Sequence, residues 1–225
     1  MHFELNAMGL AAVSTEKCDA LIVLVPQDFK AGKDDLSTLL AQTLKAGDLE
    51  AKPGKTLSLY RPVQAHATRV VLAGVGSGSA RDVRGAVLSA VAAVKSTSLK
   101  KLVVSFAAPA REDAVRAAVT AVADASYTYT TTKSKPEGRT LSKVLVAATN
   151  ATEVQASFDR AAGIVIGAEL TKEWANRPAN HATPTLLAQA AQELAQHPKI
   201  TCEVLGPKEV AKLGMGAFMA VAQGS

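Results

Sequence analysis

Cysteine, aromatic residues and long apolar runs are the rarest features of this sequence. Its two cysteines, Cys18 and Cys202, lie far apart and form no CxxC pair, so neither a disulfide-rich scaffold nor a cysteine-based zinc site is expected. Aromatic residues make up 4% of the chain, whereas hydrophobic residues together make up 48%. The core must therefore be built mainly from Ala, Val and Leu, which suits helices packed closely on a Val-rich sheet.

Membrane and export signals are also missing. No apolar stretch reaches the roughly 18 residues that a membrane-crossing helix needs. The opening MHFELNAMGL lacks the basic start and the apolar run of a secretory leader. We therefore expect a cytoplasmic protein with reduced cysteines and no membrane partner. The net charge of +5 comes from scattered Lys and Arg residues, and solubility accounts for it.

The motifs of metal, nucleophilic and nucleotide chemistry do not occur. The chain has four histidines, which are His2, His66, His181 and His197. Their spacing fits neither HExxH nor another zinc-ligand pattern, and no serine lies in a GxSxG elbow. The glycine loop Gly74–Gly78, with sequence GVGSG, lacks the third glycine of the dinucleotide fingerprint and the GK[ST] of a triphosphate site. We predict a tight strand-to-helix turn there without bound nucleotide. We assign no catalytic, cofactor-binding or metal-binding residue to this chain.

Strand and helix patterns alternate over the first 150 residues. Short apolar or alternating runs predict strands at 3–6, 20–25, 56–60, 69–73, 101–106 and 143–148. Amphipathic runs predict helices at 34–47, 80–95 and 111–124. Such alternation predicts an α/β fold, in which a mostly parallel mixed sheet is the middle of three α/β/α layers. The run 127–132 alternates Tyr and Thr and predicts a solvent-facing edge strand.

The chain beyond residue 150 begins with its longest helical run, Glu153–Ala175, which we interpret as a connecting helix. Pro178 disfavours helix in the residue before it, so the chain should turn there. Thr183 is placed to cap a new helix whose first residue is Pro184. Strands predicted at 200–205 and 218–222, with a short helix from about Pro207 between them, would open a second α/β domain. The predicted domains are therefore 1–150, the connecting helix 151–176, and 177–225.

Two blocks in this last part carry a family resemblance. The first block consists of Asn176, Pro178, Asn180, Thr183 and Pro184, and the second of Leu213–Ala217 with the closing Gln223-Gly224-Ser225. In this order they resemble the start of the catalytic domain of the leucyl aminopeptidases, the cytosol aminopeptidase family. The region upstream resembles the variable amino-terminal domain of that family in general layout only. That domain is in turn similar to macro domains.

The resemblance implies a metal-dependent aminopeptidase that releases amino-terminal residues, often leucine, from peptides. In that family two divalent cations, Mn or Zn, are held by Asp, Glu and Lys side chains and activate a water. The metal-site signature N-T-D-A-E-G-R is absent here. We therefore expect this chain to be the amino-terminal portion of such an enzyme, truncated before the metal site, inactive by itself and without bound metal. The resemblance also implies a homo-hexamer for the full-length enzyme.

Three alternative roles remain open for the first domain. It could bind an ADP-ribose-type ligand, as macro domains do, or it could serve subunit contacts in the hexamer. It could also bind DNA, as some members of the family do, and such binding would weaken steeply with salt. DNA binding would be favoured if six basic residues cluster on one surface. These residues are Arg61, Arg69, Lys100, Lys101, Lys133 and Lys135.

Overall fold

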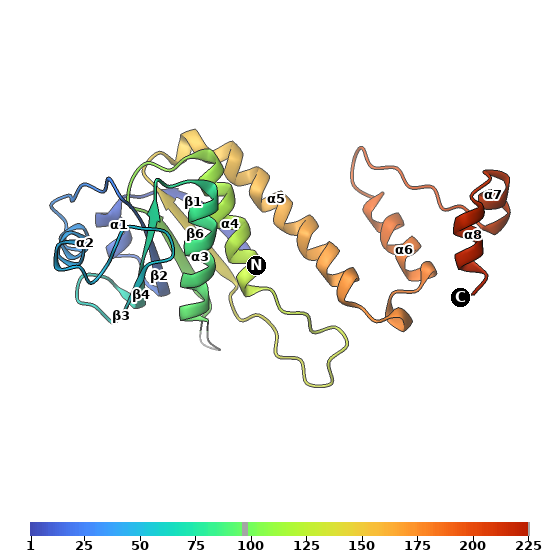
Figure 1. The fold of residues 1–225 in the computed structure, drawn as a ribbon, viewed down its shortest axis with the longest axis horizontal. Coiled ribbons are helices and arrows are strands. Elements are labelled where there is room, and N and C mark those ends of the chain that lie inside the picture. The colour runs from blue at the N-terminus through green and yellow to red at the C-terminus, as the bar shows by residue number, and fades with distance from the viewer. Residues whose placement is uncertain (96–98, 225) are drawn as a thin grey trace. The chain divides into compact units, whose positions relative to one another are not determined.

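Strands and helices alternate through the first 150 residues, as the sequence pattern predicts. The structure, a computed structural model, describes residues 1–95 and 99–224. The chain divides into two units, Met1–Lys172 and Glu173–Ser225. The elements that begin in the first unit are, in chain order (Figure 1), β1 (His2–Ala7), α1 (Leu10–Ser14), β2 (Cys18–Pro26), α2 (Asp35–Ala46), β3 (Thr56–Tyr60), β4 (Ala67–Gly76), α3 (Ala80–Val94), β5 (Lys101–Phe106), α4 (Glu112–Ser126), β6 (Lys143–Ala148) and α5 (Ala151–Asn176).

The strands form one mixed sheet in the order β1-β6-β5-β2-β4-β3. Every neighbouring pair is parallel except β3 with β4, which is antiparallel. The central strand β2 is buried along most of its length, and it carries a nearly continuous apolar run instead of an alternating one. This pattern is typical of a parallel strand that is covered on both faces. The mostly parallel sheet predicted from the sequence is confirmed.

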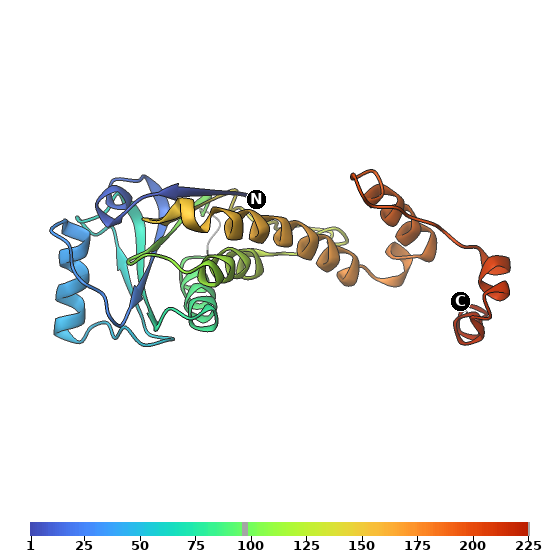
Figure 2. The ribbon, with the colours of Figure 1, turned by 90° about the horizontal axis from the view of Figure 1, so that it is seen from above.

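Helices cover both faces of the sheet and complete three layers (Figure 2). Side chains such as Ile22, Val71 and Val104 point toward α3, α4 and α5 and are fully buried. Their sequence neighbours, for example Leu21 and Val70, point to the opposite face and pack with α1 and α2. Because successive side chains of a strand alternate between faces, one apolar strand supplies both cores. The predicted α/β/α layering is confirmed.

Helix α2 shows how local sequence signals fix an element. The Asp34 side chain accepts a hydrogen bond from the Ser37 amide at 2.9 Å and caps the amino end of the helix. Gly47 ends the helix with φ +82°, a left-handed conformation that glycine adopts without a Cβ clash. The buried Leu36 and Leu40 dock the helix on the sheet.

Helix α5 is a single helix over the run predicted to be helical, and part of it packs in the core of the first unit. Val154, Phe158, Ala161 and Val165 are buried in the core shared with α3 and α4. The first unit continues to Lys172, so the boundary between the two units lies inside the helix. The helix joins the first unit because its apolar stripe has a matching apolar surface to cover.

Three segments predicted to be strands are not strands in the structure. Residues 127–132 and 200–205 are irregular, and residues 218–222 belong to a helix. No described strand lies beside any of them, and an unpaired strand leaves its backbone N–H and C=O groups unsatisfied. The last segment satisfies its own backbone as a helix, with the Met219 amide donating to the Met215 carbonyl at 3.0 Å.

The second unit holds only short helices in its described part. They are η1 (Ala179–His181), α6 (Pro184–Leu194), α7 (Pro207–Lys212) and α8 (Gly216–Ala222). Val210 is the one buried apolar residue between 173 and 224, while Phe218, Val221 and Leu213 are largely exposed. A segment of this size that buries so little cannot form an independent core. Within residues 1–95 and 99–224, no helix combines the length and the apolar character that a bilayer span requires.

Candidate functional site

One cavity of the first unit lies at the carboxyl ends of β2, β4 and β5. It has a volume of about 220 Å³ and lies where β4 and β5 end and the loops to α3 and α4 begin. Open α/β sheets place their ligand sites at this edge. Leu24, Val75 and Phe106 form apolar walls, and Asp28 and Arg111 supply the charged groups of the rim.

The glycine loop Gly74–Gly78 forms part of this cavity and is a tight turn, as predicted. Strand β4 continues through Gly76, and the chain then turns through Ser77 and Gly78 into α3. The amides of Gly74, Gly76 and Gly78 donate to the carbonyls of Lys55, Ala51 and Val75 at 2.9, 2.8 and 2.7 Å. Those three amides are therefore already used and cannot also cradle a phosphate.

The starts of α3 and α4 carry acidic residues that occupy the positions favourable to an anion. Asp82 lies in the first turn of α3, and Glu112 and Asp113 lie in the first turn of α4. The Arg111 guanidinium donates to both carboxylate oxygens of Asp113, at 3.0 and 3.1 Å. This hydrogen bond and the paired charge lower the pKa of Asp113 and raise the pKa of Arg111. The arginine of the cavity is therefore already committed to a partner.

Asn150 holds the loop that follows β5, and this loop forms one wall of the cavity. Its Oδ1 accepts from the Ala110 amide at 2.8 Å, and its Nδ2 donates to the Ala110 carbonyl at 3.0 Å. Ser157 on α5 also donates to Glu112 on α4 at 2.9 Å. These contacts tie the loop before α4 to the end of β6 and the start of α5. The site is a hollow with apolar walls and a charged rim.

The histidines are spread over the surface. His2 lies 3.3 Å from Glu4 as an exposed pair on β1. His66 lies in the loop before β4, His181 lies exposed in η1, and His197 lies exposed after α6. No three His, Cys, Asp or Glu side chains converge as a metal site anywhere in the described part of the chain.

The two cysteines have different surroundings. Cys18 is half-buried at the start of β2, and burial raises the pKa of its thiol to about 12 despite the nearby Lys101 charge. Cys202 is exposed in the irregular segment of the second unit. Cys18 therefore lacks the lowered pKa of a catalytic thiolate.

The turn at the start of the second unit follows the sequence signals closely. Arg177 stacks over the Trp174 ring, with its guanidinium 3.9 Å from the ring centroid, and also pairs with Glu173 at 3.3 Å. Pro178 then precedes η1, and Thr183 accepts from the Leu186 amide at 3.4 Å to cap α6. The predicted turn at Pro178 and the predicted Thr183 cap are both present.

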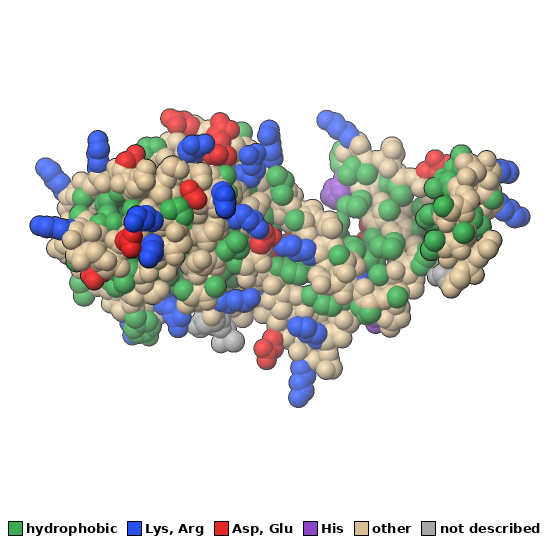
Figure 3. Space-filling view, viewed as in Figure 1, with side chains coloured by type: hydrophobic (Ala, Val, Ile, Leu, Met, Phe, Trp, Pro, Cys, Tyr) green, Lys and Arg blue, Asp and Glu red, His purple; other side chains and the backbone are tan. Residues whose placement is uncertain are grey.

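Basic residues gather at the amino-terminal edge of the sheet together with acidic ones. Arg69 and Lys101 lie at the starts of β4 and β5, and Arg61 follows β3. Lys101 is ion-paired with Glu16, and Asp19 accepts the amides of residues 100 and 101. On the face in Figure 3, Lys and Arg side chains are likewise interspersed with Asp and Glu. The charge on this edge is therefore mixed.

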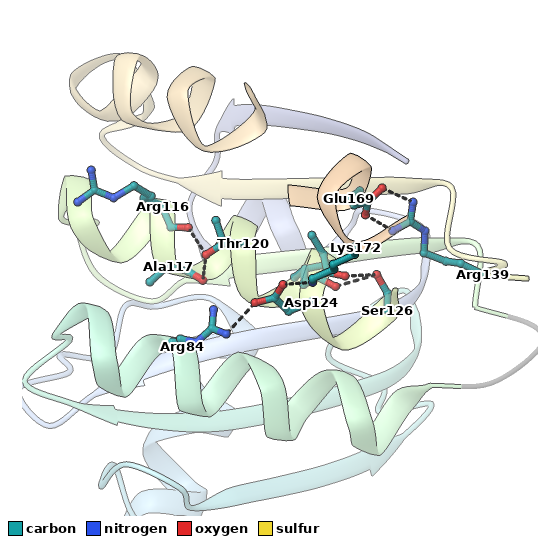
Figure 4. A network of polar contacts seen from close by, with 11 residues as sticks. Arg84, Arg116, Ala117, Thr120, Asp124, Ser126, Arg139, Glu169 and Lys172 are labelled. Carbon is teal, nitrogen blue, oxygen red and sulfur yellow. Dashed lines mark hydrogen bonds and ion pairs between the residues drawn. The ribbon is translucent and has the colours of Figure 1, made fainter. Parts of the chain in front are cut away.

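One polar network was not predicted from the sequence (Figure 4). Asp124 on α4 pairs with Arg84 on α3 and Lys172 on α5, and Glu169 on α5 pairs with Arg139. The partners lie between 30 and 48 positions apart in the chain. No local pattern brings such residues together, and only the packing of α3, α4 and α5 does so.

Comparison with known proteins assigns the two parts of the chain separately. Residues 12–136 match the model of the amino-terminal domain of the cytosol aminopeptidase family. Residues 169–225 match the model of the catalytic domain of that family. The two matches occur in the order of the two parts described above.

Individual relatives agree with this assignment. A probable cytosol aminopeptidase from Albidiferax ferrireducens is 60% identical over the whole chain, and one from Polaromonas sp. is 58% identical. The chain spans 47% and 45% of the lengths of these curated relatives.

Solved structures extend the likeness at the level of the fold. A mutant of tomato leucine aminopeptidase matches 94% of this chain and 46% of its own, with a TM-score of 0.74 and 20% identity. The bottromycin maturation enzyme BotP, in complex with Mn, matches 88% of this chain and 40% of its own, with a TM-score of 0.65 and 20% identity. At these identities the structural matches show a common fold. Because the family models match 12–136 and 169–225, the chain belongs to the cytosol aminopeptidase family.

Proposed function

We propose that this chain supplies the amino-terminal domain and the first part of the catalytic domain of a metal-dependent aminopeptidase. The enzyme releases amino-terminal residues, often leucine, from peptides. The observation that carries this proposal is the match of residues 169–225 to the catalytic domain of the family, in a chain whose residues 12–136 match its amino-terminal domain.

The residues present do not fit a pair of catalytic cations. A two-metal site needs several carboxylates that converge on ions about 3.5–4 Å apart. The described residues contain no group of three His, Cys, Asp or Glu side chains that could hold even one ion, and Glu173 is paired with Arg177. In this proposal the two cations, Mn or Zn, are held by the portion of the relatives that this chain does not span. One structural relative is described in complex with Mn.

The first unit serves the enzyme as a scaffold in this proposal. The cavity at the carboxyl ends of β2, β4 and β5 has apolar walls, Arg111 at its rim is paired with Asp113, and the amides of three loop glycines are used within the turn. These features support a structural role better than ADP-ribose binding. The proposal includes peptide substrates and a homo-hexamer for the complete enzyme, located in the cytoplasm. The names of the relatives as cytosol aminopeptidases support the location.

A chimera tests the proposal. Residues 1–225 are joined to the remaining portion of the Albidiferax ferrireducens relative, which is 60% identical over the shared part. We expect the chimera to hydrolyse a chromogenic leucine amide after addition of Mn or Zn, and the 225-residue chain to be inactive under the same conditions. The remaining portion of the relative, tested by itself, is the control for activity that does not need this chain. Metal-dependent turnover by the 225-residue chain would contradict the proposal, and so would a folded chimera that stays inert with every divalent ion tried.

A further inference from the structure

The end of α5 within the first unit is attached differently from its beginning. Val165 is the last apolar side chain of the helix that is buried in the core. Ile166, one residue later, is 73% exposed, and no side chain from Ile166 to Lys172 is buried. Hydrophobic burial therefore cannot hold this stretch against the unit, and polar contacts must do so.

The first polar attachment joins α5 to the irregular segment after α4. Arg139 donates to Glu169 through two nitrogens, at 2.5 and 3.2 Å. The two side chains are only 18% and 26% exposed. A two-pronged pair with this degree of shielding is stronger than an ordinary surface pair.

The second polar attachment follows at the next turn of the helix (Figure 4). Lys172 on α5 donates to Asp124 on α4 at 2.5 Å, and Arg84 on α3 donates to the other oxygen of Asp124 at 2.7 Å. Lys172 also lies over the Tyr127 ring, 5.3 Å from its centroid. Burial raises the pKa of Asp124, but the hydrogen bonds and charges of Lys172 and Arg84 outweigh it, and the pKa lies below its ordinary value. Three helices are thus joined through one carboxylate.

Two glycines flank the residue at which the hydrophobic attachment ends. Gly163 and Gly167 lie on either side of Val165, and a Cβ added at either position would meet nothing within 4 Å. Close packing therefore does not explain them. Each glycine weakens the helix interior relative to alanine. The helix is weakest where its mode of attachment changes from apolar to ionic.

We propose that the Arg139–Glu169 and Asp124–Lys172 pairs form a salt-sensitive clamp that holds Ile166–Lys172 of α5 against the rest of the first unit. Gly163–Gly167 is the hinge at which this stretch of the helix swings away from the unit. Mobile ions screen charges that are partly open to solvent, so rising ionic strength loosens the clamp while Val154–Val165 stays docked. The state of the clamp thus determines whether Ile166–Lys172 stays docked on the rest of the first unit or separates from it.

Amide hydrogen exchange of the 225-residue chain tests the clamp, because exchange reports local opening segment by segment. The protein is compared at 0.05 M and 1 M NaCl, and as the double variant Asp124→Asn with Glu169→Gln at the lower salt concentration. Asp159→Asn is the matched control, since it makes the same charge change on α5 but removes only a contact with Gln155 of the same helix.

We expect residues 166–172 to exchange about 5- to 30-fold faster in the double variant and measurably faster at 1 M NaCl, with residues 154–165 unchanged. Asp159→Asn should leave both segments at their original rates. Equal exchange of 166–172 at both salt concentrations would overturn the proposal. So would an acceleration that covers 154–165 to the same extent, because the helix would then open as a single body. The salt comparison needs no substitution and decides the matter if the double variant does not fold.

Discussion

Gly74 and Gly85 are expected to respond in opposite ways to the same substitution by alanine. A Cβ at Gly74 would lie 2.5 Å from the carbonyl oxygens of both Glu50 and Lys52. Those atoms are backbone, so no side-chain rotation relieves the clash. At Gly85, on the exposed side of α3, a Cβ would meet nothing within 4 Å.

The size of the Gly74→Ala effect follows from what must move. Displacing residues 50–53 strains the hydrogen bonds that Gly74 and Gly76 donate to Lys55 and Ala51, each worth about 1 kcal/mol. Forcing an extra methyl into a packed site costs about 1–3 kcal/mol more. We expect Gly74→Ala to lower the free energy of unfolding by about 3 kcal/mol. Gly85→Ala should raise it by about 0.5–1 kcal/mol, because alanine is the better helix former.

The assay is urea unfolding of both variants and the parent chain, followed by far-UV circular dichroism. Both substitutions add one methyl group, so the chemical change is matched and only the surroundings differ. A free energy of unfolding for Gly74→Ala within about 0.5 kcal/mol of that of the parent would refute the packing argument. A shift of the two variants in the same direction would refute it as well.

Further predictions concern the core, the thiols and the response to acid. Phe158→Ala should lower the free energy of unfolding by about 3–5 kcal/mol, because Phe158 is 5% exposed and anchors α5. A much smaller loss of unfolding free energy in urea would argue against that anchoring. The exposed Cys202 should react rapidly with a thiol reagent at about pH 8, while Cys18 stays unmodified because burial raises the pKa of Cys18 to about 12. Mass spectrometry distinguishes single from double labelling, and double labelling would contradict this prediction. The pKa of Asp124 is lowered in the folded protein, so its ion pairs stabilise above the ordinary pKa and are lost as pH falls through the lowered value. The stability difference between the parent and Asp124→Asn should therefore shrink below about pH 4, and an equal difference at pH 7 and pH 3 would contradict the assignment.

The fold of the first unit could be predicted because its signals are local. The apolar run of β2, the Asp34 cap and the Gly47 stop each act within a few residues of the element they define. The predictions were wrong where a strand would need a neighbour: residues 218–222 are apolar enough for a strand, but with no strand beside them they form α8. The periodicity of a sequence indicates that a segment has a buried face, but it does not show which element packs or pairs with that segment.

The candidate site could be predicted in part. The spacing of the glycine loop correctly indicated a tight turn, since the missing fingerprint glycine is a local feature. The cavity itself, the Asn150 bridge to Ala110 and the pairing of Arg111 arise from packing, and the sequence gives no sign of them. The packing of α5 in the first unit also depends on distant residues, because Phe158 and Val165 need the surface of α3 and α4 to become buried.

The pairing of β1 with β6 has a consequence for the order in which the first unit folds. His2 stands opposite Lys143 and Ala7 opposite Ala148, so among the described strands the first one, β1, pairs only with the last one, β6. During synthesis the strands β2, β3, β4 and β5 can pair among themselves while β1 still lacks a partner. Contacts between such distant residues form late, because a long loop must close first. We therefore expect β1, the first strand to leave the ribosome, to enter the sheet last, once β6 has been synthesised through Ala148.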